Sequence, residues 1–311
     1  MCGIVGLYLK DDALQPELGR RLTPMLIEMT DRGPDSAGVA VYRNGAPQGW
    51  TKLTLFHPEP GYDWDGLQRG LTDALETQCD GFRRASHYVL MTAAPAEAAR
   101  SWIAANHADL RIMSVGEAIE IYKEKGLPKD VAARFELEAM AGSHAIGHTR
   151  MATESAVTTE HSHPFSTGLD LCLVHNGSLS NHNRLRAWLR RHGIEIQTDN
   201  DSEVAAGYLT HRLREGASLK GALEAAIKDL DGFFTFAVGT RDGFAVVRDP
   251  IACKHAVMAE TDQWVAMATE YRAIAKLPGA EEAHIWEPVP GEIYSWERPG
   301  QNANGNAGET H

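Results

Sequence analysis

The order of apolar segments along the chain limits the fold more than any other sequence feature. Short runs rich in Val, Ile, Leu and small residues, typical of β-strands, lie on both sides of a block of amphipathic helices between residues 181 and 230. Strands bury faces and helices bury stripes, so two sheets with helices packed outside them satisfy both requirements. The sequence therefore predicts a layered α+β sandwich.

The amino-terminal part is predicted as strand, helix, strand and hairpin. Residues 2–9 are an apolar strand, and Pro16 opens a helix with one apolar stripe that is expected to pack on a sheet. Residues 36–42 are a second strand, and Asn44-Gly45 is a strong β-hairpin signal. This order places a helix between the first two strands.

Residues 63–140 have a different pattern and are predicted to form an inserted α/β lobe. The predicted elements are a strand at 86–91, a helix at 95–106, a strand at 110–115 and a helix at 116–125. The segment carries no catalytic-looking cluster, so packing is its first expected role and docking of a partner its second. The lobe would interrupt a single domain spanning residues 1–296.

The carboxy-terminal part is predicted to consist of paired strands and a tail. The strands are 233–238, 244–248, 256–259, 264–268 and a last pair between 284 and 296. Asp242-Gly243 is a turn that joins the first two. Residues 297–311 are polar and rich in Gly and Asn, which predicts a disordered tail.

Charge and cysteine content exclude several classes of protein. The 311 residues include 30 Lys and Arg against 42 Asp and Glu, a net charge of −12, which argues against nucleic acid or an anionic membrane as partner. The cysteines, Cys2, Cys79, Cys172 and Cys253, contain no CxxC pair. Neither a signal peptide nor an apolar run of the ~18 residues that a membrane span needs is visible. A cytoplasmic protein with reduced thiols is expected.

Cys2 has the groups of a self-sufficient nucleophile. If Met1 is removed, Cys2 carries a thiol with a pKa near ~8.5 and an α-amine with a pKa near ~8, so the amine can accept the thiol proton. Cys2 is also compatible with a small buried residue at the start of a strand. Taken alone, this stretch leaves both interpretations open.

An amide-cleaving thiol acting on an amino acid needs three further groups, and the chain offers candidates for each. Arg150 ends a predicted strand and can bind a carboxylate through two hydrogen bonds, although a surface ion pair is the alternative. Asn176 and Gly177 stop another strand and can stabilise an oxyanion, or form an ordinary turn. Asp201 begins a helix and can bind an ammonium, or cap the helix.

Six segments in this order resemble the class II glutamine amidotransferases, a family of N-terminal-nucleophile proteins. The segments are residues 1–6 (MCGIVG), 32–38 (RGPDSAG), 147–150 (GHTR), 162–165 (SHPF), 174–177 (VHNG) and 200–203 (NDSE). The similarity extends from residue 1 to about 296, apart from the lobe. It implies a four-layer α/β/β/α sandwich.

The resemblance also implies roles for the candidate residues. Cys2 matches the nucleophile, with its own amine as base, and Asn176 with Gly177 matches the oxyanion hole. The substrate L-glutamine would be bound by Arg150, Thr153 and Asp201. No metal is implied.

Residues 231–238 and 248–254 most resemble the separate amidotransferase subunit of glutamate-synthase-like complexes, including N-methylglutamate synthase. This implies a partner subunit that accepts ammonia and holds FMN and an iron–sulfur centre. No cofactor is expected in this chain, which lacks GxGxxG and a P-loop.

Three other functions are considered. A catalytically silent structural or regulatory subunit with the same fold is the main alternative. A metal hydrolase would use four histidines of the middle part, His144, His148, His161 and His163, which have no HExxH motif. A serine hydrolase is disfavoured because the chain has no GxSxG.

Overall fold

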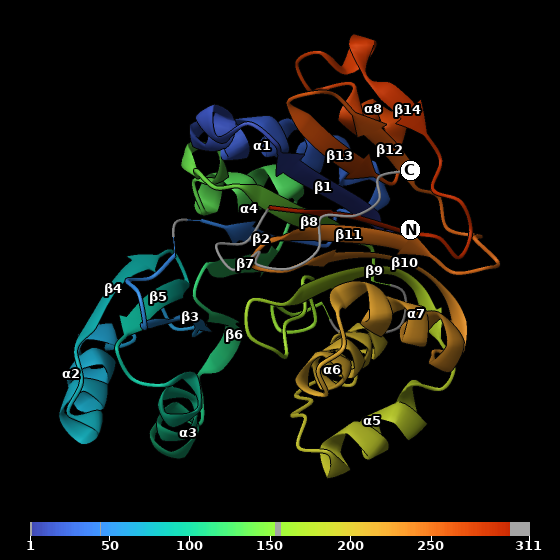
Figure 1. The fold of residues 1–311 in the computed structure, drawn as a ribbon. Coiled ribbons are helices and arrows are strands. Elements are labelled where there is room, and N and C mark those ends of the chain that lie inside the picture. The colour runs from blue at the N-terminus through green and yellow to red at the C-terminus, as the bar shows by residue number, and fades with distance from the viewer. Residues whose placement is uncertain (1, 44, 153–156, 299–311) are drawn as a thin grey trace.

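Two stacked sheets form the centre of the molecule (Figure 1). The computed structural model describes residues 2–43, 45–152 and 157–298. Within these residues the first sheet has the strand order β14-β12-β13-β1-β8-β2-β7 and the second β15-β11-β10-β9. A third sheet, β4-β5-β3-β6, lies to one side (Figure 1).

The strands of the first sheet are β1 (Gly3–Leu9), β2 (Ser36–Tyr42), β7 (Ile119–Lys125), β8 (His144–Arg150), β12 (Val257–Glu260), β13 (Trp264–Ala268) and β14 (His284–Trp286). Those of the second are β9 (Cys172–Leu179), β10 (Gly232–Gly239), β11 (Gly243–Arg248) and β15 (Ile293–Glu297). Those of the third are β3 (Thr51–Phe56), β4 (Cys79–Arg84), β5 (His87–Thr92) and β6 (Arg111–Gly116).

Helices cover the outer faces of both central sheets. The first sheet is covered by α1 (Leu18–Glu28), α4 (Pro128–Arg134) and α8 (Tyr271–Ile274). The second is covered by α5 (His182–Arg191), α6 (Asp201–Arg214) and α7 (Leu219–Asp229). The predicted α+β sandwich of four layers, α/β/β/α, is confirmed (Figure 1).

β1 is apolar throughout because both of its faces are buried. Val5 and Leu7 point to the helix side and pack in the same cluster as α1, while Ile4 and Tyr8 point to the second sheet. Full burial of each large apolar side chain stabilises the fold by roughly 1.5–3 kcal/mol. The strand is therefore held between layers, with Cys2 just before its first residue.

The stripe predicted for the first helix is the buried face of α1, with Leu22, Met25 and Leu26 fully buried. Gly19 is required here, because a Cβ atom would lie 1.8 Å from the carbonyl oxygen of Leu137. The helix thus packs directly against a short 3₁₀ turn that follows α4.

The third sheet corresponds only in part to the predicted lobe of residues 63–140. It begins with β3 at Thr51 and ends with β6 at Gly116, and it carries α2 (Trp64–Leu75) and α3 (Ala96–Asn106). The helix predicted at 116–125 is wrong, since this segment is β7 and pairs with β2 in the first sheet. Its Ile-Glu-Ile-Tyr alternation has the period of a strand.

Three other predictions about strands are corrected. β2 and β3, expected to form a hairpin around Asn44-Gly45, lie in different sheets, and Asn44 itself is outside the described residues. β14 and β15, expected as a pair, also lie in different sheets. Glu297 ends β15 and Arg298 donates to the carbonyl of Leu9 at 3.1 Å, so these two residues are not part of a disordered tail; the rest of the predicted tail, residues 299–311, is outside the described range.

A buried ion pair links the third sheet to the first. Glu120 of β7 accepts hydrogen bonds from Lys52 of β3 at 3.0 Å, from Arg43 at 3.2 Å and from Tyr122 at 2.7 Å. The side chains of Lys52 and Glu120 are 4% and 3% exposed. A buried carboxylate with three donors fixes the two sheets against each other.

We expect Glu120→Ala to lower the free energy of unfolding by roughly 3–5 kcal/mol, because it leaves the ammonium of Lys52 buried without this carboxylate. The matched control is Glu117→Ala, which removes an exposed ion pair with Arg241 and should cost less than about 1 kcal/mol. Urea denaturation of both variants measures the difference. Equal losses would contradict the prediction.

Among the described helices, none combines the length and the apolar character needed to cross a lipid bilayer.

Candidate active site

A cavity of about 610 Å³ opens where β1, β8 and β9 meet the amino terminus of α6. Its described lining residues are Cys2, Arg32, Arg150, Met151, Ala152, His163, His175, Asn176, Gly177, Ser178, His182, Asp199, Asn200, Asp201, Ser202, Lys254, His255 and Thr269. All predicted site residues that the structure describes are in this set. Thr153, predicted to bind substrate, is outside the described residues.

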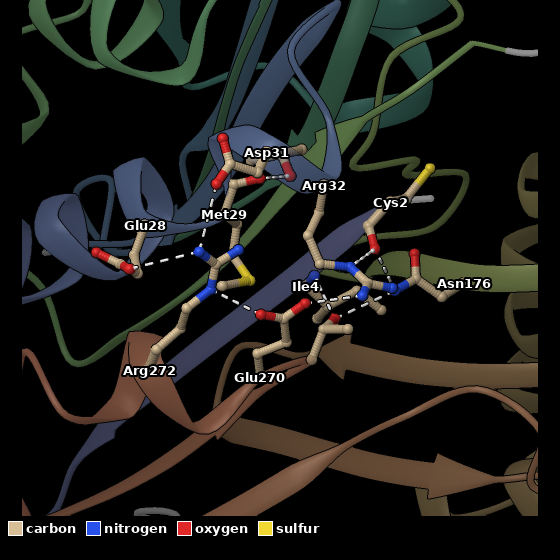
Figure 2. A network of polar contacts seen from close by, with 11 residues as sticks. Cys2, Ile4, Glu28, Met29, Asp31, Arg32, Asn176, Glu270 and Arg272 are labelled. Carbon is tan, nitrogen blue, oxygen red and sulfur yellow. Dashed lines mark hydrogen bonds and ion pairs between the residues drawn. The ribbon is translucent and has the colours of Figure 1, made fainter.

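Cys2 is held by its backbone, and its side chain faces the cavity. Its carbonyl oxygen accepts hydrogen bonds from Nδ2 of Asn176 at 3.1 Å and from Nε of Arg32 at 3.3 Å. Its Sγ lies 3.9 Å from the carbonyl oxygen of Met151. Figure 2 shows the sulfur pointing away from the guanidinium of Arg32, so the thiol is accessible while the backbone is fixed.

Asn176 and Gly177 lie side by side at the wall of the cavity; they do not end the strand as predicted, because β9 continues through them to Leu179. The side-chain amide of Asn176 donates to the Cys2 carbonyl and, at 3.2 Å, to Oγ1 of Thr269. In this conformation the predicted oxyanion donor is therefore bonded to the nucleophile's own backbone. Gly177 has φ +152°, and a Cβ atom would lie 2.0 Å from the carbonyl oxygen of Phe233, so no other residue fits.

Asp201 contributes a carboxylate held ionised at the start of α6. The helix cap is Asn200, whose side chain accepts from the N–H of Ser202 at 2.8 Å. The carboxylate of Asp201 instead accepts from the N–H of Leu179 at 2.9 Å. Burial raises the pKa of Asp201, but the His175 imidazole and the Leu179 N–H outweigh burial and lower it to about 2.

This shift predicts a pH dependence of stability. The pKa of Asp201 is lower in the folded state than the ordinary value near ~4, so the carboxylate stabilises the fold above pH ~4 and loses this effect as the pH falls through about 2. We expect Asp201→Asn to cost on the order of 2 kcal/mol at pH 6 and progressively less below pH ~4.

Thermal unfolding of both proteins from pH 6 down to pH 2.5 measures this gap. Asp199→Asn is the control, because the side chain of Asp199 is 82% exposed. Its stability should differ little from that of the wild type at every pH. A gap for Asp201→Asn that stays constant with pH would contradict the prediction.

Arg150 ends β8 and places a cation in the same cavity. The residue is 5% exposed. Its carbonyl accepts from the N–H of Asp35 at 3.1 Å, and the carboxylate of Asp35 accepts from the N–H of Ala152 at 2.8 Å. The turn after β8 is thus held by the RGPDSAG segment. Arg150 and Asp201 are a cation and an anion in the same cavity lining, which suits the two charged groups of an amino acid.

His148, His163 and His175 form a cluster at the cavity wall, and His163 and His175 are among the lining residues. His148 and His163 stack with ring centroids 4.0 Å apart, and Ser202 Oγ lies 2.9 Å from His163 Nε2 and 3.0 Å from His175 Nδ1. Burial lowers the pKa of His148 to about 3 and that of His163 well below its usual range. The imidazoles of His148 and His163 are therefore uncharged packing and hydrogen-bonding groups at neutral pH.

The histidines considered as metal ligands occupy three different surroundings. His144 stacks on Tyr42, His161 lies 3.1 Å from Asp199 at the surface, and only His148 and His163 are together. Within the described ranges, no group of three His, Cys, Asp or Glu side chains could hold a metal ion.

For several lining residues the sequence alone predicted no role. Arg32 lies in the RGPDSAG segment and Ser202 in the NDSE segment, so the resemblance could have suggested both. Thr269 follows an apolar strand without any motif, and Lys254 and His255 lie in a loop. These three enter the site only through the packing of the sheets.

Comparisons with known proteins bear on the family of the chain. The glutamine amidotransferase domain family matches residues 148–276. The chain is 57% identical over 297 residues to the glutamine amidotransferase-like protein GlxB of Rhizobium meliloti (strain 1021), covering 96% of this chain and 98% of GlxB. It is 30% identical over 310 residues to a protein of Methanothermobacter thermautotrophicus whose name also assigns it to the glutamine amidotransferases, covering 96% of this chain and all of that protein.

A solved structure shares the fold. It is the glutamine phosphoribosylpyrophosphate amidotransferase of B. subtilis, complexed with ADP and GMP, with a TM-score of 0.60 at 20% identity over 95% of this chain. The match spans 47% of that enzyme chain, and at this identity it bears on the fold alone. The fold, the site and the two full-length relatives lead to one conclusion: the chain belongs to the class II glutamine amidotransferases.

Proposed function

We propose that this chain hydrolyses L-glutamine to glutamate and ammonia as the cytoplasmic glutaminase subunit of a glutamate-synthase-like or N-methylglutamate synthase complex. The observation that carries the proposal is the convergence of Cys2, Arg150, Asn176, Gly177 and Asp201 on one cavity. A thiol, a cation, an anion and oxyanion donors are the groups that a free amino acid amide requires.

Binding uses the two charges of the substrate. The guanidinium of Arg150 receives the α-carboxylate of glutamine through two hydrogen bonds, and the carboxylate of Asp201 receives its α-ammonium. The side-chain amide of glutamine then extends toward Sγ of Cys2. Thr153, outside the described residues, belongs to the same binding loop by resemblance.

Chemistry starts once Met1 has been removed, because Cys2 then has a free α-amine. The amine takes the thiol proton, the thiolate attacks the carboxamide carbon, and the oxyanion forms hydrogen bonds with Asn176 and the N–H of Gly177. The amide of Asn176 must exchange its bond to the Cys2 carbonyl for one to the oxyanion. The α-ammonium then protonates the amide nitrogen, the C–N bond breaks and ammonia leaves, and water hydrolyses the thioester to glutamate and the free thiol.

The partner chain is proposed to accept the ammonia and to hold FMN and an iron–sulfur centre. No residue of this chain is assigned to either cofactor. The support is the similarity of residues 231–238, in β10, and of residues 248–254 to separate amidotransferase subunits of such complexes.

A second candidate is a catalytically silent subunit with a structural or regulatory role. The observation that favours it is that the Asn176 amide is occupied by the Cys2 carbonyl. In this case Met1 would remain in place and block the amine.

The experiment that separates the two candidates is purification of the native complex, intact-mass analysis of this chain and a glutaminase assay with and without the partner chains. Loss of Met1 together with ammonia release from glutamine supports the glutaminase. A retained Met1, or a processed chain that releases no ammonia in its complex, supports the silent subunit. Absorbance of flavin and iron–sulfur in the partner tests the proposed complex.

A further inference from the structure

The corner between β13 and α8 contacts both described donors to the Cys2 carbonyl, Arg32 and Asn176 (Figure 2). Oγ1 of Thr269 accepts from the N–H of Ile4 at 2.8 Å and from Nδ2 of Asn176 at 3.2 Å. Oε1 of Glu270 accepts from Arg32 at 2.8 Å. Two consecutive residues, far from Cys2 in sequence, therefore determine where its neighbours lie.

Glu270 is itself held from the opposite side. Its Oε2 accepts from Nε of Arg272 at 2.6 Å, and Arg272 also pairs with Asp31 at 3.4 Å and Glu28 at 3.7 Å. Burial raises the pKa of Glu270, but the hydrogen bonds from Arg32 and Arg272 outweigh burial and lower it. The carboxylate is thus an ionised, doubly anchored acceptor for Arg32.

The two donors on the Cys2 carbonyl set the direction of the nucleophile. Arg32 and Asn176 approach the same oxygen, which restricts rotation about the Cα–C bond of Cys2. This bond fixes the position of Cα relative to β1, and hence the positions of Sγ and the α-nitrogen over the cavity. A displacement of about 1 Å at a reacting atom can cost on the order of 10²-fold in rate.

We propose that Glu270 is a positioning residue for Cys2. Its carboxylate fixes the guanidinium of Arg32, which still holds the Cys2 carbonyl when the Asn176 amide turns to the oxyanion, and thereby aims the thiol at the glutamine amide. The proposal rests on the proposed function. Arg32 and Thr269 line the cavity, whereas Glu270 is not among the described lining residues. Glu270 therefore acts through Arg32, and its substitution should not change the affinity for substrate.

The test compares Glu270→Ala and Glu270→Gln with the wild-type chain, each purified with its amino terminus processed and in its native complex. We expect kcat for glutamine hydrolysis to fall roughly 10- to 100-fold in Glu270→Ala, with KM within about threefold of the wild type. Glu270→Gln keeps one acceptor oxygen for Arg32 and should lose less.

The matched control is Glu28→Gln. Glu28 pairs with Arg272 at 3.7 Å and with Lys276 at 3.0 Å, so it belongs to the same charge network but does not contact Arg32. Its kcat and KM should equal those of the wild type. A wild-type kcat in Glu270→Ala, an equal loss in Glu28→Gln, or a loss that lies in KM would each overturn the proposal.

Crystal structures of the two Glu270 variants supply a measurement that needs no turnover. A guanidinium of Arg32 and a carbonyl of Cys2 displaced from their wild-type positions support the proposal, and both groups unmoved overturn it. If Glu270→Ala does not fold, Glu270→Gln carries both measurements. If the wild-type complex hydrolyses no glutamine, the proposed function is refuted. The positions of the Arg32 guanidinium and the Cys2 carbonyl in the variant structures would still decide whether Glu270 positions Cys2.

Discussion

Replacing Cys2 by Ala should abolish glutamine hydrolysis, with a rate at least about 10³-fold below that of the wild-type complex. The substitution removes the atom that forms the thioester and leaves the backbone contacts of residue 2 to Asn176 and Arg32 in place. Binding of glutamine at Arg150 and Asp201 should persist. The measurements are ammonia release and, separately, glutamine affinity by calorimetry.

The other cysteines should not replace Cys2. Burial raises the pKa of Cys172 to about 11, so its thiol is protonated at neutral pH. Cys79 lies in β4 of the third sheet, where its thiol donates to Thr92 at 3.3 Å. Cys79→Ala is therefore the matched control and should keep wild-type activity. Iodoacetamide should inactivate the wild type in step with alkylation of Cys2, followed by peptide mass mapping because the exposed Cys253 can also react. Glutaminase activity surviving in Cys2→Ala would refute the mechanism.

Replacing Arg150 by Gln should raise KM for glutamine roughly 100-fold or more, with a smaller change in kcat. The planar guanidinium can give two charge-assisted hydrogen bonds to the α-carboxylate, and a neutral amide cannot match their strength or charge. Arg150→Lys keeps the positive charge but cannot form the two parallel hydrogen bonds. Its KM should lie between those of Arg150→Gln and the wild type. Steady-state kinetics over a wide range of glutamine concentration measures both constants.

Two controls accompany the Arg150 variants. Arg241→Gln removes an arginine whose side chain is 56% exposed and pairs with Glu117, and its KM should be unchanged. Because Arg150 is buried, thermal unfolding must show that each variant is folded at the assay temperature. A folded Arg150→Gln with wild-type KM would show that another group binds the carboxylate.

Elements that depend on local pattern were predictable. The apolar run of β1, the stripe of α1 and the capping residues before α6 lie within one turn or strand of sequence. The Asp242-Gly243 turn does join β10 to β11. In each case the physical signal, apolar periodicity or a cap, is contained in neighbouring residues.

Elements that depend on distant partners were mispredicted. Residues 116–125 are rich in Glu and Lys, which favour helices, yet the strand β7 completes the edge of the first sheet by pairing with β2. β14 and β15 were expected to pair with each other, but they extend opposite sheets. Strands pair where pairing buries apolar surface in the folded protein. Residues next to a strand in the sequence do not determine its partner.

The sequence by itself determined the chemical groups of the site and the order in which they occur: the thiol of Cys2, the guanidinium of Arg150, the amide of Asn176 and the carboxylate of Asp201. Their meeting in one cavity follows from two long-range pairings, β1 with β8 and β9 with β10, together with the stacking of the two sheets. Only the tertiary structure decided that Asn176 bonds the Cys2 carbonyl and that Glu270 holds Arg32. Hydrogen bonds between residues more than 170 positions apart exist only after the layers have packed, and therefore no local pattern in the sequence signals them.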